Sequence, residues 1–177
     1  AASTDLVARS QLLDPGDFGQ TVEKLSLYML DQDRAATVAD IAVCAPSSTE
    51  ASLDDILNIV AEAKTGEIGP LMTKLKAQGT QPVGLCIGAT RHFRTLYAAA
   101  SDPAGAASGM GRVRPPVFGP RRDRMIRQAG AWGAARLEVA LTMLTDTDLQ
   151  LRSAGQHAPA MELVERTLIR LAMLARR

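Results

Sequence analysis

Six arginines fall within one short stretch of the chain, residues 112–127, together with a single acid, Asp123. They are Arg112, Arg114, Arg121, Arg122, Arg124 and Arg127. A guanidinium group presents planar donors that bind carboxylates and phosphates through paired hydrogen bonds. The stiff pair Pro115-Pro116 and one aromatic, Phe118, lie among these arginines. The stretch therefore predicts either a solvated loop leading into a basic helix face, or a docking surface for an acidic partner or for the nucleic-acid backbone. A single aromatic makes it a poor platform for stacking single strands.

Catalytic chemistry has little support in the sequence. The only two histidines, His92 and His157, lack partners at metal-ligand or nucleophile spacing, and no HExxH, Gly-x-Ser-x-Gly or CxxC motif occurs. We interpret His92 as an exposed or half-buried structural residue and place His157 in a turn. Asp146 and Asp148 stand two apart, and helix N-capping is a better interpretation of them than metal binding. We therefore expect no catalytic residue, no cofactor and no metal, and a small helical enzyme is the least favoured reading.

A glycine-rich stretch, residues 104–111, invites comparison with a phosphate-binding loop. Such a loop needs a preceding strand, and a Gly-Lys-Ser/Thr end that contacts the phosphates. No strand is expected before residue 104, and no such end follows it. We interpret the stretch as a linker loop and expect the chain to bind no ATP.

The composition indicates what kind of elements must hold these residues. The chain has 177 residues, of which 29 are Ala and 21 Leu, against 10 Val and 7 Ile. Helix formers therefore outnumber β-branched residues, which predicts an all-α fold. Only six residues are aromatic, so the core must be built mainly from Leu, Ala and Met. No apolar run of about 18 residues exists, so no transmembrane helix is expected.

Charge is distributed unevenly along the chain. Residues 1–50 hold eight acids and three bases, whereas residues 111–177 hold six acids and twelve bases, all twelve of them Arg. This asymmetry suggests interaction with an acidic partner or with phosphate. Two isolated cysteines, Cys44 and Cys86, are typical of reduced, partly buried thiols, and we expect a cytoplasmic protein.

The apolar periodicity predicts a series of helices and one boundary. Ala45–Glu50 is the candidate boundary because it is rich in Pro, Ser and Thr and has no apolar period. Ser52 is expected to cap the helix that follows, which Gly66 should stop. Pro82 suits the first turn of a long helix. The expected helices are 4–13, 17–30, 37–44, 52–65, 70–78, 82–100, 121–128, 132–145, 147–154 and 159–176, with residues 101–120 irregular.

Several segments, in this order and spacing, resemble one family, the delta subunit of the bacterial DNA polymerase III clamp loader. The segments are Glu23–Tyr28, Thr37–Val43, Lys64–Leu71, Gly79–Pro82, Arg91–Leu96 and Arg114–Phe118 with the later Trp132. The resemblance covers nearly all of the chain. One departure is Gly119-Pro120, where the family has a more basic and bulkier continuation.

The resemblance implies a small helical lid domain over residues 1–49 and a helical collar domain over residues 50–177. It implies a subunit that hydrolyses no ATP and that joins the loader ATPase subunits through the collar, within a DNA polymerase holoenzyme, a nucleotidyltransferase complex of DNA replication. It also implies that the sliding clamp is contacted only through an N-terminal domain absent from this sequence. We expect DNA binding to be weak and non-specific. The alternative is a stand-alone helical nucleic-acid-binding or regulatory protein that uses Arg112–Arg127 directly.

Overall fold

The computed structural model describes residues 2–10, 15–44 and 49–176, and every regular element in them is an α-helix. The prediction of an all-α fold is confirmed over this part of the chain. The chain divides into two compact units, Ala1–Ser48 and Thr49–Arg177. Of the predicted boundary 45–50, residues 45–48 lie outside the described residues, as do residues 11–13 of the first predicted helix.

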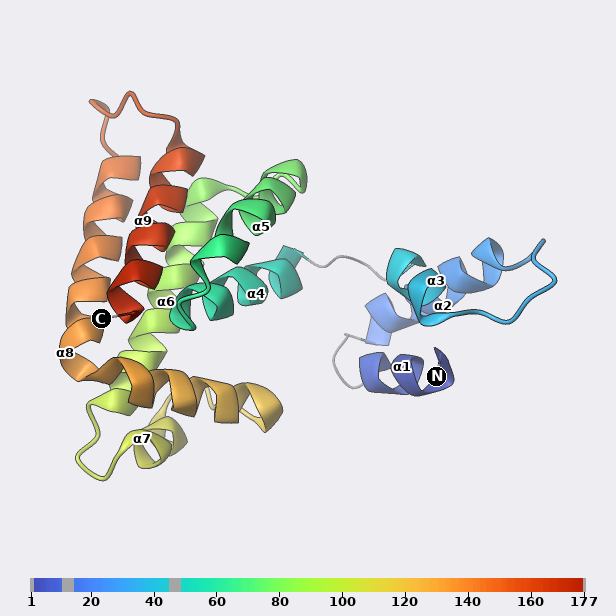
Figure 1. The fold of residues 1–177 in the computed structure, drawn as a ribbon, viewed down its shortest axis with the longest axis horizontal. Helices are drawn as coiled ribbons and strands as arrows, with labels where there is room; N and C mark the ends of the chain where they lie inside the picture. The colour runs from blue at the N-terminus through green and yellow to red at the C-terminus, as the bar shows by residue number, and fades with distance from the viewer. Residues whose placement is uncertain (1, 11–14, 45–48, 177) are drawn as a thin grey trace. The chain divides into compact units, whose positions relative to one another are not determined.

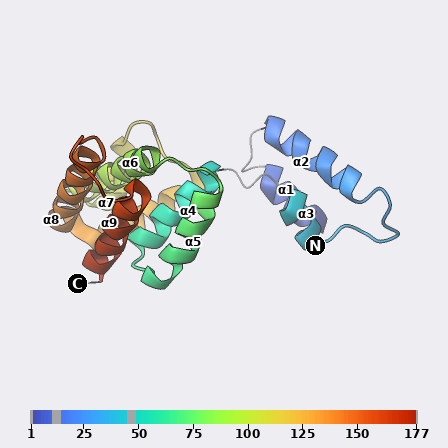
Figure 2. The same ribbon diagram turned by 90° about the horizontal axis from the view of Figure 1, so that it is seen from above.

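The N-terminal unit contains three described helices that each pack against the other two (Figure 1 and Figure 2). They are α1 (Ala2–Ser10), α2 (Pro15–Tyr28) and α3 (Val38–Cys44). Among the described residues of this unit, the buried apolar core consists of Leu25, Ile41 and Cys44.

A capping box formed by Thr37 and Asp40 starts α3. The Thr37 hydroxyl accepts a hydrogen bond from the Asp40 backbone N–H at 3.4 Å, and Asp40 accepts one from the Thr37 backbone N–H at 2.8 Å. Arg34 donates two further bonds to the Asp40 carboxylate, at 2.6 and 2.8 Å. These donors, first of all Arg34, hold the pKa of Asp40 well below its usual range. The reciprocal bonds satisfy donors that a helix start leaves unpaired.

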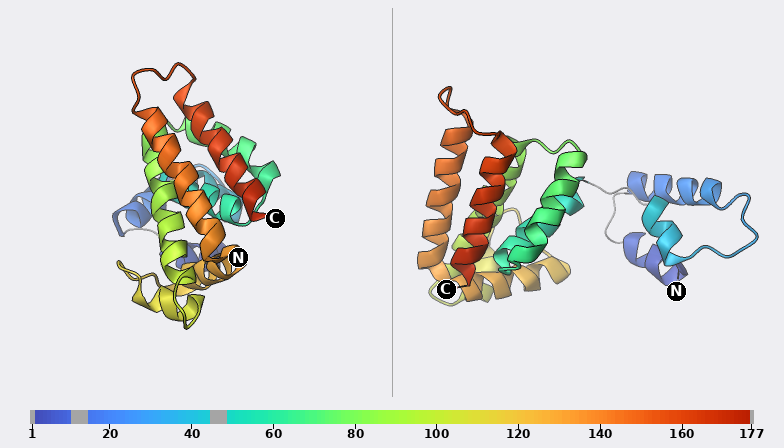
Figure 3. Two further views of the ribbon diagram at one scale, coloured as in Figure 1. Left: turned by 90° about the vertical axis from the view of Figure 1, so that its left-hand side faces the viewer. Right: turned by 45° about the horizontal axis from the view of Figure 1, so that its top comes forward.

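The C-terminal unit is a bundle built around one central helix, α6 (Pro82–Ala100). In Figure 3, α9 and the second half of α8 run side by side and are joined by a loop at one end, and α6 lies against them. The buried core brings Phe93 of α6 against Trp132 of α8, edge to face, with ring centroids 5.1 Å apart. The other helices are α4 (Thr49–Ala61), α5 (Thr65–Ala77), α7 (Ala106–Arg112), α8 (Gly119–Leu151) and α9 (Ala160–Ala175).

Helix α8 (Gly119–Leu151) covers the predicted helices 121–128 and 132–145 and most of 147–154, and it consists of two helical segments that meet in a kink at Gly133. The predicted break near residue 130 therefore lies close to this kink, whereas the break predicted before residue 147 is wrong. Gly133 has φ 69° and ψ 158°, a left-handed backbone conformation that favours glycine. Asp146 and Asp148 lie inside this helix, so the predicted capping role is wrong. The threonines beside them fit the helix because their hydroxyls donate to carbonyls four residues earlier.

Three further boundaries differ from the prediction. Helix α4 ends at Ala61 and not at Gly66, because Ala63 adopts a positive φ of 59°. Helix α5 begins at Thr65 and carries Pro70 inside it, although Pro70 was expected to start a helix. Ser52 is buried inside α4 and does not cap it.

The glycine-rich stretch is not a plain linker loop, because it forms most of helix α7. Gly105 lies just before α7, and Gly109 is buried where α7 meets α6. A Cβ atom at Gly109 would lie 2.7 Å from the Ala99 Cα and still closer to the Ala99 carbonyl oxygen. The small residues therefore allow close backbone packing of α7 on α6.

Candidate functional site: arginines around α6, α7 and α8

The six arginines of residues 112–127 do not form one surface. Arg112 ends α7 and forms an ion pair with Asp102 at 2.8 Å. Arg114 is exposed and donates only to backbone carbonyls, the nearest being that of Val113 at 3.0 Å. These two residues precede α8, and both keep donors that can reach a ligand.

Arg121 and Arg122 join α8 to other elements. Arg121 donates two hydrogen bonds to the Asp54 carboxylate on α4, at 2.7 and 3.0 Å. Arg122 is half-buried and donates to the Ala107 carbonyl of α7 at 3.5 Å. A bidentate pair of this kind engages much of the guanidinium, so Arg121 has fewer donors left for a partner.

Arg124 belongs to a polar network under the first half of α8. Its Nε donates to Glu62, which also accepts from Gln128 Nε2 at 3.3 Å. The Arg124 hydrogen bond is the main reason that the pKa of Glu62 is lowered to about 2. Gln128 Nε2 donates to Asn58 at 2.8 Å, and Gln128 Oε1 lies 3.1 Å from His92 Nε2. The network therefore links α4, α6 and α8.

His92 is buried, not exposed or half-buried as the sequence suggested. It is 6% exposed, and burial lowers its pKa to about 4, although the Gln128 hydrogen bond acts in the opposite direction. A neutral ring whose Nε2 faces the Gln128 oxygen must carry its proton on Nε2. His92 thus has a structural role, as expected, but from inside the core.

Arg127 has no side-chain hydrogen bond or ion pair within residues 2–10, 15–44 and 49–176, and it is exposed on α8. Of the six predicted contact residues, three are paired with carboxylates: Arg112 with Asp102, Arg121 with Asp54 and Arg124 with Glu62. Arg127 and Arg114 are exposed and have no carboxylate partner among the described residues. Contact of these arginines with an acidic partner or with the nucleic-acid backbone stays a prediction.

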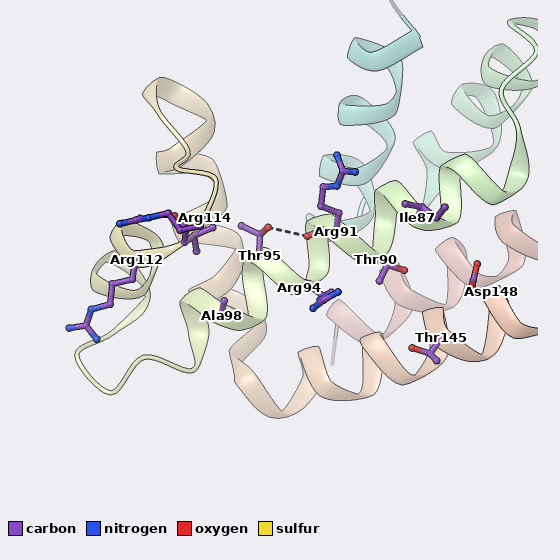
Figure 4. Close-up of a pocket in the computed structure, with 11 residues that line it drawn as sticks. Ile87, Thr90, Arg91, Arg94, Thr95, Ala98, Arg112, Arg114, Thr145 and Asp148 are labelled. Carbon is purple, nitrogen blue, oxygen red and sulfur yellow. Dashed lines mark hydrogen bonds between the residues drawn. The ribbon is translucent and has the colours of Figure 1, made fainter.

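The structure instead places Arg112 and Arg114 next to two arginines of α6 (Figure 4). Together they line an open cleft of about 620 Å³, which we call the arginine cleft. Arg91 and Arg94 come from α6, and Arg112 and Arg114 from the end of α7 and the segment after it. The remaining lining residues are Ile87, Thr90, Thr95, Ala98, Val113, Thr145 and Asp148.

Sequence reasoning missed Arg91 and Arg94 as members of this group. Their spacing of three on a helix predicts that they share a face. That signal cannot show which other arginines lie nearby. In Figure 4 the two side chains diverge, with Arg94 on the side of α8 and Arg91 pointing toward α4. The positive charge is therefore spread along the cleft.

A second cleft of about 500 Å³, the proline cleft, adjoins the first and shares Arg91, Thr95 and Arg114 with it. Pro115, Pro116 and Phe118 form part of its wall. The Phe118 side chain is 76% exposed. Phe118, the one aromatic among the arginines of residues 112–127, is therefore accessible. It lies on the side of α6 that faces α4.

Other candidate groups give no site. His157 is exposed, and within the described residues no three His, Cys, Asp or Glu side chains are grouped as metal ligands would be. Cys44 and Cys86 are both buried, and burial raises the pKa of the Cys86 thiol to about 11. Among the helices of the described part, none is long and apolar enough to cross a membrane.

The arrangement of helices is that of a clamp-loader delta-like fold. A structure similar to this one is the DNA clamp loader delta protein YqeN of Bacillus subtilis, with a TM-score of 0.66 and 17% sequence identity. The match covers 88% of this chain and 45% of YqeN, so this chain spans less than half of that protein. No family model matches the chain, and no curated protein matches its sequence. At this identity the likeness shows the fold alone.

Proposed function

We propose that this chain is a non-catalytic subunit of a DNA polymerase III clamp-loader complex, acting in DNA replication. The observation that carries the proposal is the fold likeness to the clamp loader delta protein, which extends over 88% of the chain. The segments Glu23–Tyr28 and Arg114–Phe118, whose sequences resemble the delta subunit, agree with this likeness.

Within this proposal, residues 50–177 form the collar domain that assembles with the loader ATPase subunits, and residues 1–49 form the lid domain. The C-terminal unit has the larger buried core of the two units. It also exposes large apolar side chains on its two outer helices, Val139 and Leu149 on α8 and Met173 on α9. Exposed apolar residues of this kind supply the packing that holds subunits together.

Charged residues should then contribute less to assembly than apolar packing does. Arginines at the rim of an interface change the rate of association more than the final affinity, and their effect decreases at high salt. Replacing Arg121, Arg122 and Arg124 together is a poor test of that effect, because Arg121 and Arg124 are paired with Asp54 and Glu62 inside the unit. Replacing the accessible Arg127 is a cleaner one.

The direct test mixes the full chain with the loader ATPase subunits of the same organism and follows complex formation by size exclusion with light scattering. We expect a stoichiometric complex that Leu149→Glu on α8 weakens. Leu30→Glu, which changes an even more exposed leucine of the N-terminal unit, serves as the control. Failure of the unaltered chain to form any complex would refute the proposal.

A parallel titration separates this function from the stand-alone nucleic-acid binder. For primed duplex DNA we expect a Kd no tighter than roughly 10⁻⁶ M at physiological salt, the range of non-specific binding. The pairing of Arg121 with Asp54 supports this expectation, because the carboxylate competes with phosphate for the same donors. Tight, sequence-selective DNA binding without subunit binding would favour the alternative.

A further inference from the structure

We propose that the arginine cleft binds a segment of a protein partner in which acidic residues are interspersed with aliphatic ones. The cleft lies between α6, α7 and α8, and it should bind such a segment whether or not the chain assembles into a clamp loader. Three features of the cleft, its charge, its hydroxyl groups and its apolar wall, point to the same ligand chemistry.

The positive charge of the cleft favours a ligand with several anionic groups. Arg91 and Arg94 are exposed, and neither has a side-chain hydrogen bond or ion pair in the part of the chain that the structure describes. Arg114 donates only to backbone carbonyls, which leaves its charge without a counterion there. Because these guanidinium groups are spread along the cleft (Figure 4), an extended ligand with several carboxylates suits them better than one small anion.

The hydroxyl groups of the cleft favour a ligand that carries hydrogen-bond donors. Thr90 donates its hydroxyl proton to the Cys86 carbonyl at 2.9 Å, and Thr145 donates to Leu141 at 2.9 Å. Thr95 does the same to Arg91 at 3.0 Å. With its proton engaged, each hydroxyl oxygen can only accept a hydrogen bond from a ligand. The N–H groups of a peptide backbone supply such donors, whereas the phosphodiester backbone of a nucleic acid has none.

The wall of the cleft calls for aliphatic contacts. Ile87, Ala98 and Val113 line it, and Ile87 is 45% exposed. None of the cleft's lining residues is aromatic, so it offers no platform on which bases could stack. Asp148, held by Arg152 at 2.9 Å, also lines the cleft and opposes a continuous polyanion. An acidic peptide that places a Leu or Ile side chain on Ile87 meets all of these conditions.

The test uses the full chain and a panel of twelve-residue fluorescent peptides in which Asp or Glu alternates with Leu or Ile in different registers. Binding is measured by fluorescence polarisation, and the site is mapped by NMR amide shifts. A peptide with Lys in place of the acids and the oligonucleotide dT12 are the reference probes. We expect at least one acidic peptide to bind and to shift the amides of Thr90, Thr95 and Ala98.

Variants identify which groups are responsible. Arg91→Gln with Arg94→Gln should weaken peptide binding about fivefold or more and should reduce its salt dependence. Arg166→Gln with Arg170→Gln on α9 removes the same charge from two exposed residues outside the cleft and should leave binding unchanged. Ile87→Ser should weaken binding several-fold while leaving the salt dependence as it is, because it removes only apolar contact.

Several results would overturn the proposal. Absence of binding by every acidic peptide would do so, as would equal losses in the cleft variant and the α9 control. If dT12 binds more tightly than the peptides and loses affinity in the Arg91/Arg94 variant, the cleft is a nucleic-acid site instead. A peptide whose amide shifts map away from α6 would equally contradict it.

Discussion

Gly109→Ala tests the close packing of α7 on α6. The new Cβ would meet the backbone of Ala99, 2.7 Å from its Cα and closer to its carbonyl oxygen. Backbone cannot rotate away as a flexible side chain can, so α7 must shift or detach. Overpacking of this kind costs about 1–3 kcal/mol. Ala gains about 1 kcal/mol over Gly inside a helix, which offsets part of that loss. We expect a net loss of about 0–2 kcal/mol.

Gly111→Ala is the matched control because Gly111 lies in the same helix with nothing within 4 Å of its Cβ position. This variant should be unchanged or more stable by up to about 1 kcal/mol. The two variants should therefore differ by roughly 1–3 kcal/mol. With a urea dependence of about 1–3 kcal/mol per molar, their midpoints should lie on the order of 1 M apart.

Trp132 provides the assay, since it is the only tryptophan of the chain and its side chain is 2% exposed in the C-terminal unit. Urea unfolding followed by Trp132 fluorescence reports this unit alone. Hydrogen exchange at Met110, which is buried in α7, distinguishes local detachment from global loss of stability. Equal urea midpoints and equal Met110 protection in the two variants would show that α7 does not pack on α6 as described.

Three further predictions concern titratable groups of the C-terminal unit. The folded-state pKa of Glu62 is lowered to about 2 from 4.5, so the stability it provides should be lost as pH falls from about 4.5 to 2, and Glu62→Gln should flatten an acid-unfolding curve in that range. The pKa of His92 is lowered to about 4 from 6.5, because burial disfavours its charged form, so the unfolded chain takes up a proton first. The free energy of unfolding should therefore decrease as the pH falls from about 6.5 to 4. It can be measured by urea titration at several pH values. A His92→Gln variant whose free energy of unfolding depended on pH as steeply as that of the unaltered chain would contradict this. Cys86, whose pKa is raised to about 11, should react with iodoacetamide at pH 8 at least tenfold more slowly in the folded chain than in urea, as peptide mass spectrometry can measure.

Helix α6 shows what local sequence information can determine. The sequence predicted a helix over 82–100, and the structure has Pro82–Ala100 with Leu85, Phe93 and Leu96 fully buried. Apolar spacing of three and four residues orients one face of a helix wherever it packs, and Pro fits its first turn. Both signals come from residues close in sequence, so no tertiary information is needed to use them.

Helices α7 and α8 show where local information is insufficient. Residues 104–111 have weak helix propensity, yet α7 forms there because Gly109 allows the backbone to approach Ala99 and Met110 is buried. In α8 the sequence of Asp146 and Asp148 suggests a new helix start, but the helix continues through them because it packs against α9. There the Thr147 and Thr167 hydroxyl groups form a hydrogen bond at 2.8 Å. Burial against a distant element outweighs a local preference of a few tenths of a kcal/mol.

The sequence by itself determined that this chain is helical, rich in arginine near residue 120, and without a recognisable catalytic motif. Only the tertiary structure decided which arginines can meet a ligand. It pairs Arg121 with Asp54, 67 residues away, and brings Arg91 and Arg94 beside Arg112 and Arg114. Adjacency in sequence places residues on one helix, but the charge that a partner meets depends on which carboxylates other helices bring to each guanidinium. That pairing is set by the packing of α4, α6, α7 and α8, which no short segment encodes.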